Sequence, residues 1–331
     1  IKQGSGATVT IPNGNVKAVY LDGAGSGAAV ADAFSFLNVG GLSTSTAGTD
    51  NVRIGEGAGD SIASGGNNNV VIGKDAGTAL TTGDGNVAVG FEALKTEDAD
   101  GTTTAVGYQA LKTQNAGADS HNTAVGNIAG TSITTGIQNT VIGSQSGDAL
   151  TDGGENTAVG WLSLSTDTRG SKSTAIGRAA LANQSSSIAA DKNNTAVGYN
   201  AGLEVTTGLN NTIVGSAAGD ALTTGGNNTV VGYESLSAED GHGNNTAIGF
   251  QSLKVQDAGA NAANTAIGFQ SGVAVTDGHS NTLLGTLAGS VLTTGDENTY
   301  VGYSAGSSGT ATFTGNTALG VNTFAAGANV G

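Results

Sequence analysis

The sequence predicts an all-β fold, a parallel β-solenoid of about 16 coils over residues 42–331. Three observations predict it. A motif of the form Asn-Thr-x-aliphatic-Gly recurs along most of the chain, as at 122–126, 156–160 and 194–198. The spacing between successive motif glycines is nearly constant. The composition combines 57 Gly with small aliphatic residues and few aromatics. A fixed short period with a thin apolar core is typical of stacked repeats.

The motif glycine measures the period. The sixteen motif glycines are Gly55, Gly73, Gly90, Gly107, Gly126, Gly143, Gly160, Gly177, Gly198, Gly215, Gly232, Gly249, Gly268, Gly285, Gly302 and Gly320. Ten of the gaps are 17 residues long and the others range from 18 to 21. We interpret each unit as one coil made of two short strands joined by tight turns. At about 4.8 Å per coil, the rod is roughly 75 Å long.

Two columns of the motif share one strand face, because side chains alternate with period two. A branched aliphatic residue precedes each motif glycine, and a β-branched residue stands two places earlier. We expect both columns to fill the coil interior. The predicted core ladder is Ile54, Ile72, Val89, Val106, Val125, Ile142, Val159, Ile176, Val197, Val214, Val231, Ile248, Ile267, Leu284, Val301 and Leu319.

The middle column of the motif is also mostly apolar, and a strand that is apolar on both faces is buried on both. We therefore expect this column to contact another copy of the chain, which predicts a homotrimer. The predicted inter-chain column is Val71, Ala88, Ala124, Val141, Ala158, Ala196, Ile213, Val230, Ala266 and Leu283.

Two kinds of coil follow the motif. In eight units, termed Gly-type, the fourth residue after the motif glycine is Gly and the seventh is aliphatic, as in Gly147 with Leu150. In six units, termed Leu-type, the fourth is Leu and the seventh is polar, as in Leu94 with Glu97, Leu164 with Asp167 and Leu236 with Glu239. This exchange predicts one large side chain per coil, since two would overfill the interior and none would leave a void.

The two kinds alternate in pairs, which gives a foursome of about 70 residues. The last foursome departs from this order, with Gly306 in its third unit and Phe324 in its fourth, as expected of a terminal cap. Turns of the form Thr-(Thr/Asp)-Gly-x-x-Asn close seven Gly-type units. The recurring Asn predicts a ladder of stacked side chains. The longest insertions follow Leu111, Leu181 and Leu253, where we expect partner contacts.

Residues 1–41 lie outside the repeat and predict a small β-β-α connector. Residues 7–23 have the pattern of two strands around a turn at Pro12-Asn13-Gly14, and residues 25–37 the pattern of a short helix. The run Gly23 to Ala28 fits the dinucleotide-binding pattern G-x-G-x-x-A. We interpret it as a glycine-rich turn, because the solenoid begins almost at once.

Composition excludes several function classes. A net charge of −15 argues against phosphate-mediated binding of nucleic acid, and no Cys is present for thiol chemistry. No apolar run reaches the length of a membrane span. His121, His242 and His279 fall in expected turns, and the acidic residues at 97–100 and 239–240 are interpreted as solvated loop charge, with weak calcium binding as the alternative. We expect no catalytic residue, no cofactor and no metal site.

The repeat resembles two related groups of proteins. One is the head domain of trimeric autotransporter adhesins, and the other is the repetitive tail-fibre proteins of marine bacteriophages, especially cyanophages. The segments that carry the resemblance are 107–111, 122–126 and the lead-in at 6–34. The resemblance implies a left-handed β-roll that packs as a homotrimer. The lead-in favours the phage fibre, and no adhesin anchor or heptad stalk is present in this sequence.

The sequence therefore predicts a non-enzymatic fibre segment of a phage tail in the extracellular virion. Its expected partners are itself, other virion tail proteins and a host cell-surface glycan or protein. The alternative is the head of a bacterial surface adhesin. A glycan-degrading enzyme would need paired carboxylates in a cleft, and no pair stands out. An ice-binding face would need outward threonines, whereas the expected register turns them inward.

Overall fold

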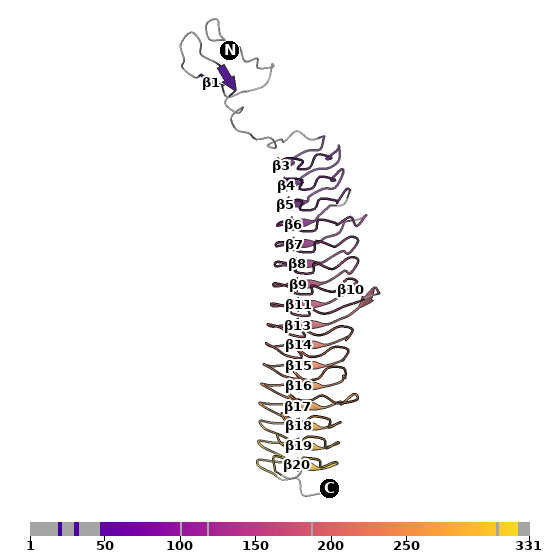
Figure 1. The fold of residues 1–331 in the computed structure, drawn as a ribbon, viewed down its shortest axis with the longest axis vertical. Coiled ribbons are helices and arrows are strands. Elements are labelled where there is room, and N and C mark those ends of the chain that lie inside the picture. The colour runs from indigo at the N-terminus through magenta and orange to yellow at the C-terminus, as the bar shows by residue number, and fades with distance from the viewer. Residues whose placement is uncertain are drawn as a thin grey trace.

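The chain forms a long rod in which one parallel β-sheet runs from end to end (Figure 1). The computed structural model describes residues 19–21, 30–32, 47–99, 101–117, 119–186, 188–308 and 311–323. Each coil of the rod contributes one three-residue strand, and sixteen such strands pair in chain order. The predicted parallel β-solenoid and its number of coils are confirmed, and the described residues include no helix.

The strands coincide with the three central residues of the sixteen motifs. They are β3 (Val52–Ile54), β4 (Val70–Ile72), β5 (Val87–Val89), β6 (Thr104–Val106), β7 (Thr123–Val125), β8 (Thr140–Ile142), β9 (Thr157–Val159), β11 (Thr174–Ile176), β13 (Thr195–Val197), β14 (Thr212–Val214), β15 (Thr229–Val231), β16 (Thr246–Ile248), β17 (Thr265–Ile267), β18 (Thr282–Leu284), β19 (Thr299–Val301) and β20 (Thr317–Leu319). Pairing is in register throughout, so that equivalent residues of successive motifs lie side by side, as Thr212 and Thr229 do.

The second side of each coil is a chain of turns and not the second strand that the sequence predicted. Residues there have left-handed backbone conformations that a strand excludes, as Glu92 and Leu94 do at φ 54° and 50°. Coil-to-coil hydrogen bonds continue on this side, for example from Gly77 N to the Ala93 carbonyl at 2.9 Å. Outside the long sheet, β12 (Ala190–Asp191), which lies in the insertion after Leu181, pairs in parallel with β10 (Gly170–Ser171) of the preceding coil.

The motif glycine is required by stacking as well as by backbone conformation. Motif glycines have φ between 117° and 147°, a region that other residues rarely adopt. A Cβ atom on Gly107 would overlap the carbonyl group of Gly126 in the next coil, and the same overlap recurs at motif glycines from Gly55 to Gly302. Any side chain at this position would force neighbouring coils apart.

The strands face the opposite way from the prediction, which is the main correction to the sequence analysis. The middle column, predicted to contact another chain, is fully buried inside the single chain. Each of Val71, Ala88, Ala124, Val141, Ala158, Ala196, Ile213, Val230, Ala266 and Leu283 has an exposed fraction of 0%. The predicted core ladder lies on the outer face instead, where Ile54, Val125 and Leu284 are 39%, 37% and 43% exposed.

Hydroxyl groups and volume explain this orientation. Thirteen of the sixteen motifs place Thr on the same strand face as the ladder aliphatic. An inward threonine column would bury a hydroxyl in every coil, which is costly without a hydrogen-bond partner. The interior is also narrow, because large aliphatic side chains from the turn side already enter it. The middle residue, which is alanine in nine of the sixteen motifs, fits between them.

The exchange between Gly-type and Leu-type coils is confirmed. In Gly-type coils the seventh residue after the motif glycine enters the core, as Leu150 and Leu222 do. In Leu-type coils the fourth residue enters it, as Leu164 and Leu236 do. A Cβ atom added to Gly147 would lie 3.1 Å from Leu150 Cδ1 and 2.8 Å from Val141 Cγ1. A second large side chain from the turn side therefore does not fit into the same coil.

The fifteenth coil fills its interior from a third position. Tyr300, in the middle column, is 2% exposed, and a Cβ atom on Gly306 would overlap its ring. Gly306 replaces the expected Leu because the tyrosine already supplies the large side chain. Phe324, the other predicted departure, lies outside the described residues.

The predicted asparagine ladder is also confirmed. The side-chain oxygen of Asn122 accepts the backbone N–H of Asn139 at 2.7 Å, and the side-chain nitrogen of Asn139 donates to the Gly153 carbonyl at 2.9 Å. The same pair of bonds repeats along the rod and closes each turn against its strand. Thr103 and Ser173 take the asparagine position in two coils, and their backbone N–H groups still donate to the preceding asparagine.

The N-terminal segment contains β1 (Val19–Leu21) and β2 (Val30–Asp32), which pair antiparallel. β2 lies within the helix predicted for residues 25–37, so that prediction is wrong for these residues. In place of the helix, the backbone of Val30 and Ala31 pairs with Leu21 and Tyr20 of β1. The helix that a dinucleotide site needs after the glycine run is replaced by a strand at 30–32. The turn predicted at Pro12-Asn13-Gly14 lies outside the described residues.

Candidate functional site

The largest surface feature is the outer face of the sixteen-stranded sheet. We define the outer face as the threonine column and the aliphatic column of β3 to β20, excluding β10 and β12. Ile142, Val214 and Leu284 on this face are 37%, 36% and 43% exposed. Because every coil contributes one such aliphatic residue in register, the face is a continuous apolar strip along the rod. Strips of this size on a protein surface mark an interaction site.

A second column borders the outer face. The residue after each motif glycine is turned outward, and in half of the coils it is aromatic. These aromatics are Phe91, Tyr108, Trp161, Tyr199, Tyr233, Phe250, Phe269 and Tyr303, each between 37% and 52% exposed. We call this the aromatic column. This column was not predicted from the sequence, although each of its residues directly follows a motif glycine.

Neighbouring rings of the aromatic column stack along the rod. The Phe91 and Tyr108 ring centroids are 5.3 Å apart, and Phe250 lies between Tyr233 and Phe269 at 5.5 Å and 5.2 Å. In the middle of the rod, the Arg178 guanidinium lies 4.7 Å from the Trp161 ring and 5.0 Å from the Tyr199 ring. These contacts are within the range of favourable π-stacking and cation–π geometry.

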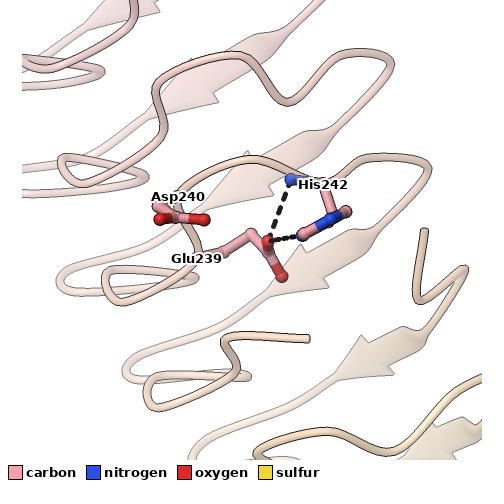
Figure 2. A group of neighbouring side chains, drawn as sticks. All are labelled: Glu239, Asp240 and His242. Carbon is pink, nitrogen blue, oxygen red and sulfur yellow. Dashed lines mark hydrogen bonds and ion pairs between the residues drawn. The ribbon is translucent and has the colours of Figure 1, made fainter. Parts of the chain in front are cut away.

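A cluster of two carboxylates and a histidine has the residue types of a metal site. Glu239, Asp240 and His242 offer ligand atoms within 4.8 Å of one another, and Figure 2 shows Glu239 between the other two. Glu239 is fully buried. Its Oε1 atom accepts the backbone N–H of His242 at 3.0 Å, and its Oε2 atom accepts the Gln256 amide at 2.9 Å. Both carboxylate oxygens of Glu239 thus already accept hydrogen bonds within the fold, and we assign this residue to the turn.

A buried carboxylate that accepts a hydrogen bond from a glutamine recurs in two other pairs of coils, which supports the assignment of Glu239 to the turn. Each first Leu-type coil of the first three foursomes buries an acidic residue at the seventh position, and each second Leu-type coil buries a glutamine there. Gln114, Gln184 and Gln256 donate to Glu97, Asp167 and Glu239 at 2.8, 2.6 and 2.9 Å. We call these pairs the acid–glutamine networks. Glu97 and Glu239 are therefore interior groups, which corrects their interpretation as solvated loop charge.

The glutamine of each network also accepts a hydrogen bond from the asparagine ladder. The side chains of Asn122, Asn194 and Asn264 donate to Gln114, Gln184 and Gln256 at 2.8, 2.9 and 2.9 Å. The polar group thus replaces the large aliphatic residue of the Gly-type coil while its hydrogen-bonding atoms stay paired, as buried polar groups require.

Two of the same coil pairs carry a Glu–Lys ion pair on the surface of their turns, away from the outer face of the sheet. Glu92 contacts Lys95 and Lys112, each at 2.6 Å, and accepts the Gln109 amide at 2.8 Å. The lysine partners lower the pKa of Glu92 to about 2. Glu234 repeats this pattern with Lys254 at 2.6 Å, and Lys254 lowers its pKa to about 2.

The three histidines all lie in turns. His121 Nδ1 is 3.1 Å from the Asp119 carbonyl, and His279 Nδ1 is 3.3 Å from Asp296 Oδ1. The insertion after Leu181 adds a shallow hollow beside Lys192, whose side chain donates to the Ser185 carbonyl at 3.2 Å. Burial lowers the pKa of Lys192. A single cation at an open, mostly apolar hollow does not define a ligand.

Comparison with known protein families, with curated proteins and with solved structures finds no match to this chain. Within the part of the chain that the structure describes, no helix is long and apolar enough to cross a membrane.

Proposed function

We propose that this chain is a structural fibre segment, a phage tail-fibre rod that assembles as a homotrimer and presents a receptor-binding surface. One observation carries the proposal, namely the apolar outer face that extends over all sixteen coils. Its removal from water is favourable in proportion to the apolar area buried. A partner that covers the whole face needs a surface of the same length and repeat, and another copy of the chain has both.

The outer face replaces the middle column as the proposed contact between chains. The in-register sheet lets aliphatic rows of one copy lie along those of the next. The rod architecture also suits a fibre, since a solenoid grows in length without growing in width. The lead-in and repeat patterns that resemble marine phage fibres are the reason for naming the virion, and a bacterial surface adhesin is the alternative. Genes for virion proteins beside this gene would favour the phage.

The oligomeric state tests the proposal. We expect light scattering on the purified chain to give about three times the protomer mass of 31.8 kDa. Val125→Lys combined with Ile142→Lys places two ammonium groups on the outer face and should release protomers with an unchanged β-type circular dichroism spectrum. Ala99→Lys, on an exposed turn, is the matched control and should stay trimeric. A wild-type chain that remains monomeric at micromolar concentration would contradict the trimer.

The observed register also favours a second candidate function, ice binding. Ice binding needs outward threonines. The structure turns the threonines outward in thirteen successive coils from Thr104 to Thr317. A regular row of hydroxyl and methyl groups on a flat sheet is what an ordered layer of water would match. A monomer that inhibits ice recrystallisation would favour this function over the trimeric fibre, which buries the same face.

A further inference from the structure

The aromatic column contains two kinds of position, which we call rungs. At a filled rung, a ring lies between two other rings. Phe250 is a filled rung, because it stacks on Tyr233 and on Phe269. At an open rung, a short hydroxyl side chain lies between two aromatic coils. Ser216 is an open rung between the coils of Tyr199 and Tyr233, and Thr286 is one between the coils of Phe269 and Tyr303.

The open rungs leave room for one ring. Rings one coil apart are separated by 5.2–5.5 Å, and the coil repeat is about 4.8 Å. The rings on either side of an open rung are therefore about 10 Å apart. Tyr199 has Arg178 on one side, and its next neighbour in the column on the other side is Ser216. Phe250 shows that a six-membered ring fills the same interval in a neighbouring coil.

We propose that the open rungs at Ser216 and Thr286 bind pyranose rings of a neutral glycan. A pyranose ring presents C–H groups on both faces and hydroxyl groups around its edge. The two aromatic residues of an open rung cover the faces. Ser216 or Thr286 offers a hydroxyl at the base of each rung. A purely aromatic guest would offer this hydroxyl no hydrogen-bonding group.

Charge selects among glycans and against nucleotides. The chain has a net charge of −15. This net charge repels an anionic sugar or a phosphate, whereas it does not affect a neutral sugar. The two open rungs are four coils apart, or about 19 Å, so that one polysaccharide chain can engage both with a gain in avidity. This inference rests on the proposed receptor-presenting function for the source of the glycan.

The test fills the open rungs. Ser216→Phe combined with Thr286→Phe extends each stack as Phe250 does, whereas Ser216→Ala combined with Thr286→Val keeps the rungs open and is the matched control. The probes are the neutral hexasaccharides of cellulose, starch, laminarin, mannan and chitin. Binding is measured on the full chain by saturation-transfer NMR and by quenching of tyrosine fluorescence. We expect at least one hexasaccharide to bind, a loss of affinity of tenfold or more in the Phe variant, and a change below threefold in the control.

Three outcomes would overturn the proposal. They are no binding of any hexasaccharide, equal binding by the wild type and the Phe variant, and a Phe variant whose oligomeric mass changes, since the rungs would then be contacts between chains. Light scattering on the same samples separates this inference from the proposed function. A trimer without sugar binding removes only the glycan inference, and a monomer that binds sugar removes only the trimer.

Discussion

Gly-type and Leu-type coils have the same strand and the same motif glycine, but they fill the coil interior from different positions of the turn side. A Gly-type coil takes its large side chain from the seventh position and keeps the fourth as glycine. A Leu-type coil takes it from the fourth position, where Leu236 adopts φ 49°, a left-handed conformation that leucine rarely has. Interior volume therefore outweighs backbone preference at this position.

The exchange also frees the seventh position for polar groups. Each pair of Leu-type coils in the first three foursomes uses it for an acid–glutamine network, and two of the pairs add a Glu–Lys bridge on the outer surface. A Gly-type coil has an aliphatic residue at the same place. Leu-type pairs are thus polar inserts at regular intervals in an otherwise apolar core. Such inserts favour one order of coils, because an acidic residue without its glutamine would lose one of its buried hydrogen-bond donors.

The first and largest effect is expected from placing both large side chains in one coil. Gly219→Leu adds a second large side chain beside Leu222, whose Cδ1 would lie 2.9 Å from the new Cβ atom. Overpacking and the left-handed backbone together should reduce the free energy of unfolding by about 3 kcal/mol. Urea denaturation followed by circular dichroism measures the change.

A rescue distinguishes this explanation from general damage. Gly219→Leu combined with Leu222→Ala converts the coil to the Leu-type filling and should recover more than half of the loss. Val214→Leu, which adds one methylene on the outer face, is the control and should change the free energy by less than about 0.5 kcal/mol. If the double variant is no more stable than Gly219→Leu alone, the exchange of one large side chain between the fourth and seventh positions does not explain the coil types.

The second effect is expected from breaking an acid–glutamine network. Gln256→Leu keeps the volume but leaves Glu239 Oε2 without its donor in a buried place. We expect a loss of about 1–2 kcal/mol, the penalty of an unpaired buried polar atom. Hydrogen exchange should increase in the coils of β15 and β16, which this bond joins. Gln251→Leu removes an amide from the outer surface of the same coil and should have less than half this effect. Equal effects of the two variants would argue against a special role for the network.

Much of the fold follows from local spacing and volume, and these parts were predicted. The strand positions, the number of coils, the Gly/Leu exchange and the asparagine ladder each depend on residues within one or two units. Which face of the strands points inward was predicted wrongly, because both faces are apolar by composition. Two signals point to the observed direction. Threonine recurs on one face, and the middle residue is larger than alanine in the second coil of every foursome, where it is Val71, Val141, Ile213 or Leu283. Because the side-chain size in this column varies with the coil type, the column contributes to the coil interior.

The polar interior was missed for a related reason. Glu97 and Glu239 stand next to other acidic residues, which is typical of a solvated loop. They also stand at the seventh position, where Gly-type coils bury an aliphatic residue. Position in the repeat was the better guide, because stacking forces equivalent positions into equivalent environments. The aromatic column is readable in the same way, but which rings stack depends on the coil spacing and twist of the assembled rod.

The third and smallest effect concerns the outer bridge of the Leu-type pair. The lysine contacts lower the pKa of Glu92 to about 2, below the usual value near 4.3. The bridge therefore contributes stability above about pH 5 and loses it as the pH falls toward 2. Because the lysines are partly exposed, we expect this contribution to be below about 1 kcal/mol. Glu92→Gln should lower the urea midpoint slightly at pH 7 and leave it unchanged at pH 2. Glu297→Gln, on an exposed turn of a Gly-type coil, should change neither value. An equal loss at both pH values in Glu92→Gln would show that packing of the side chain, and not its charge, stabilises the Leu-type pair.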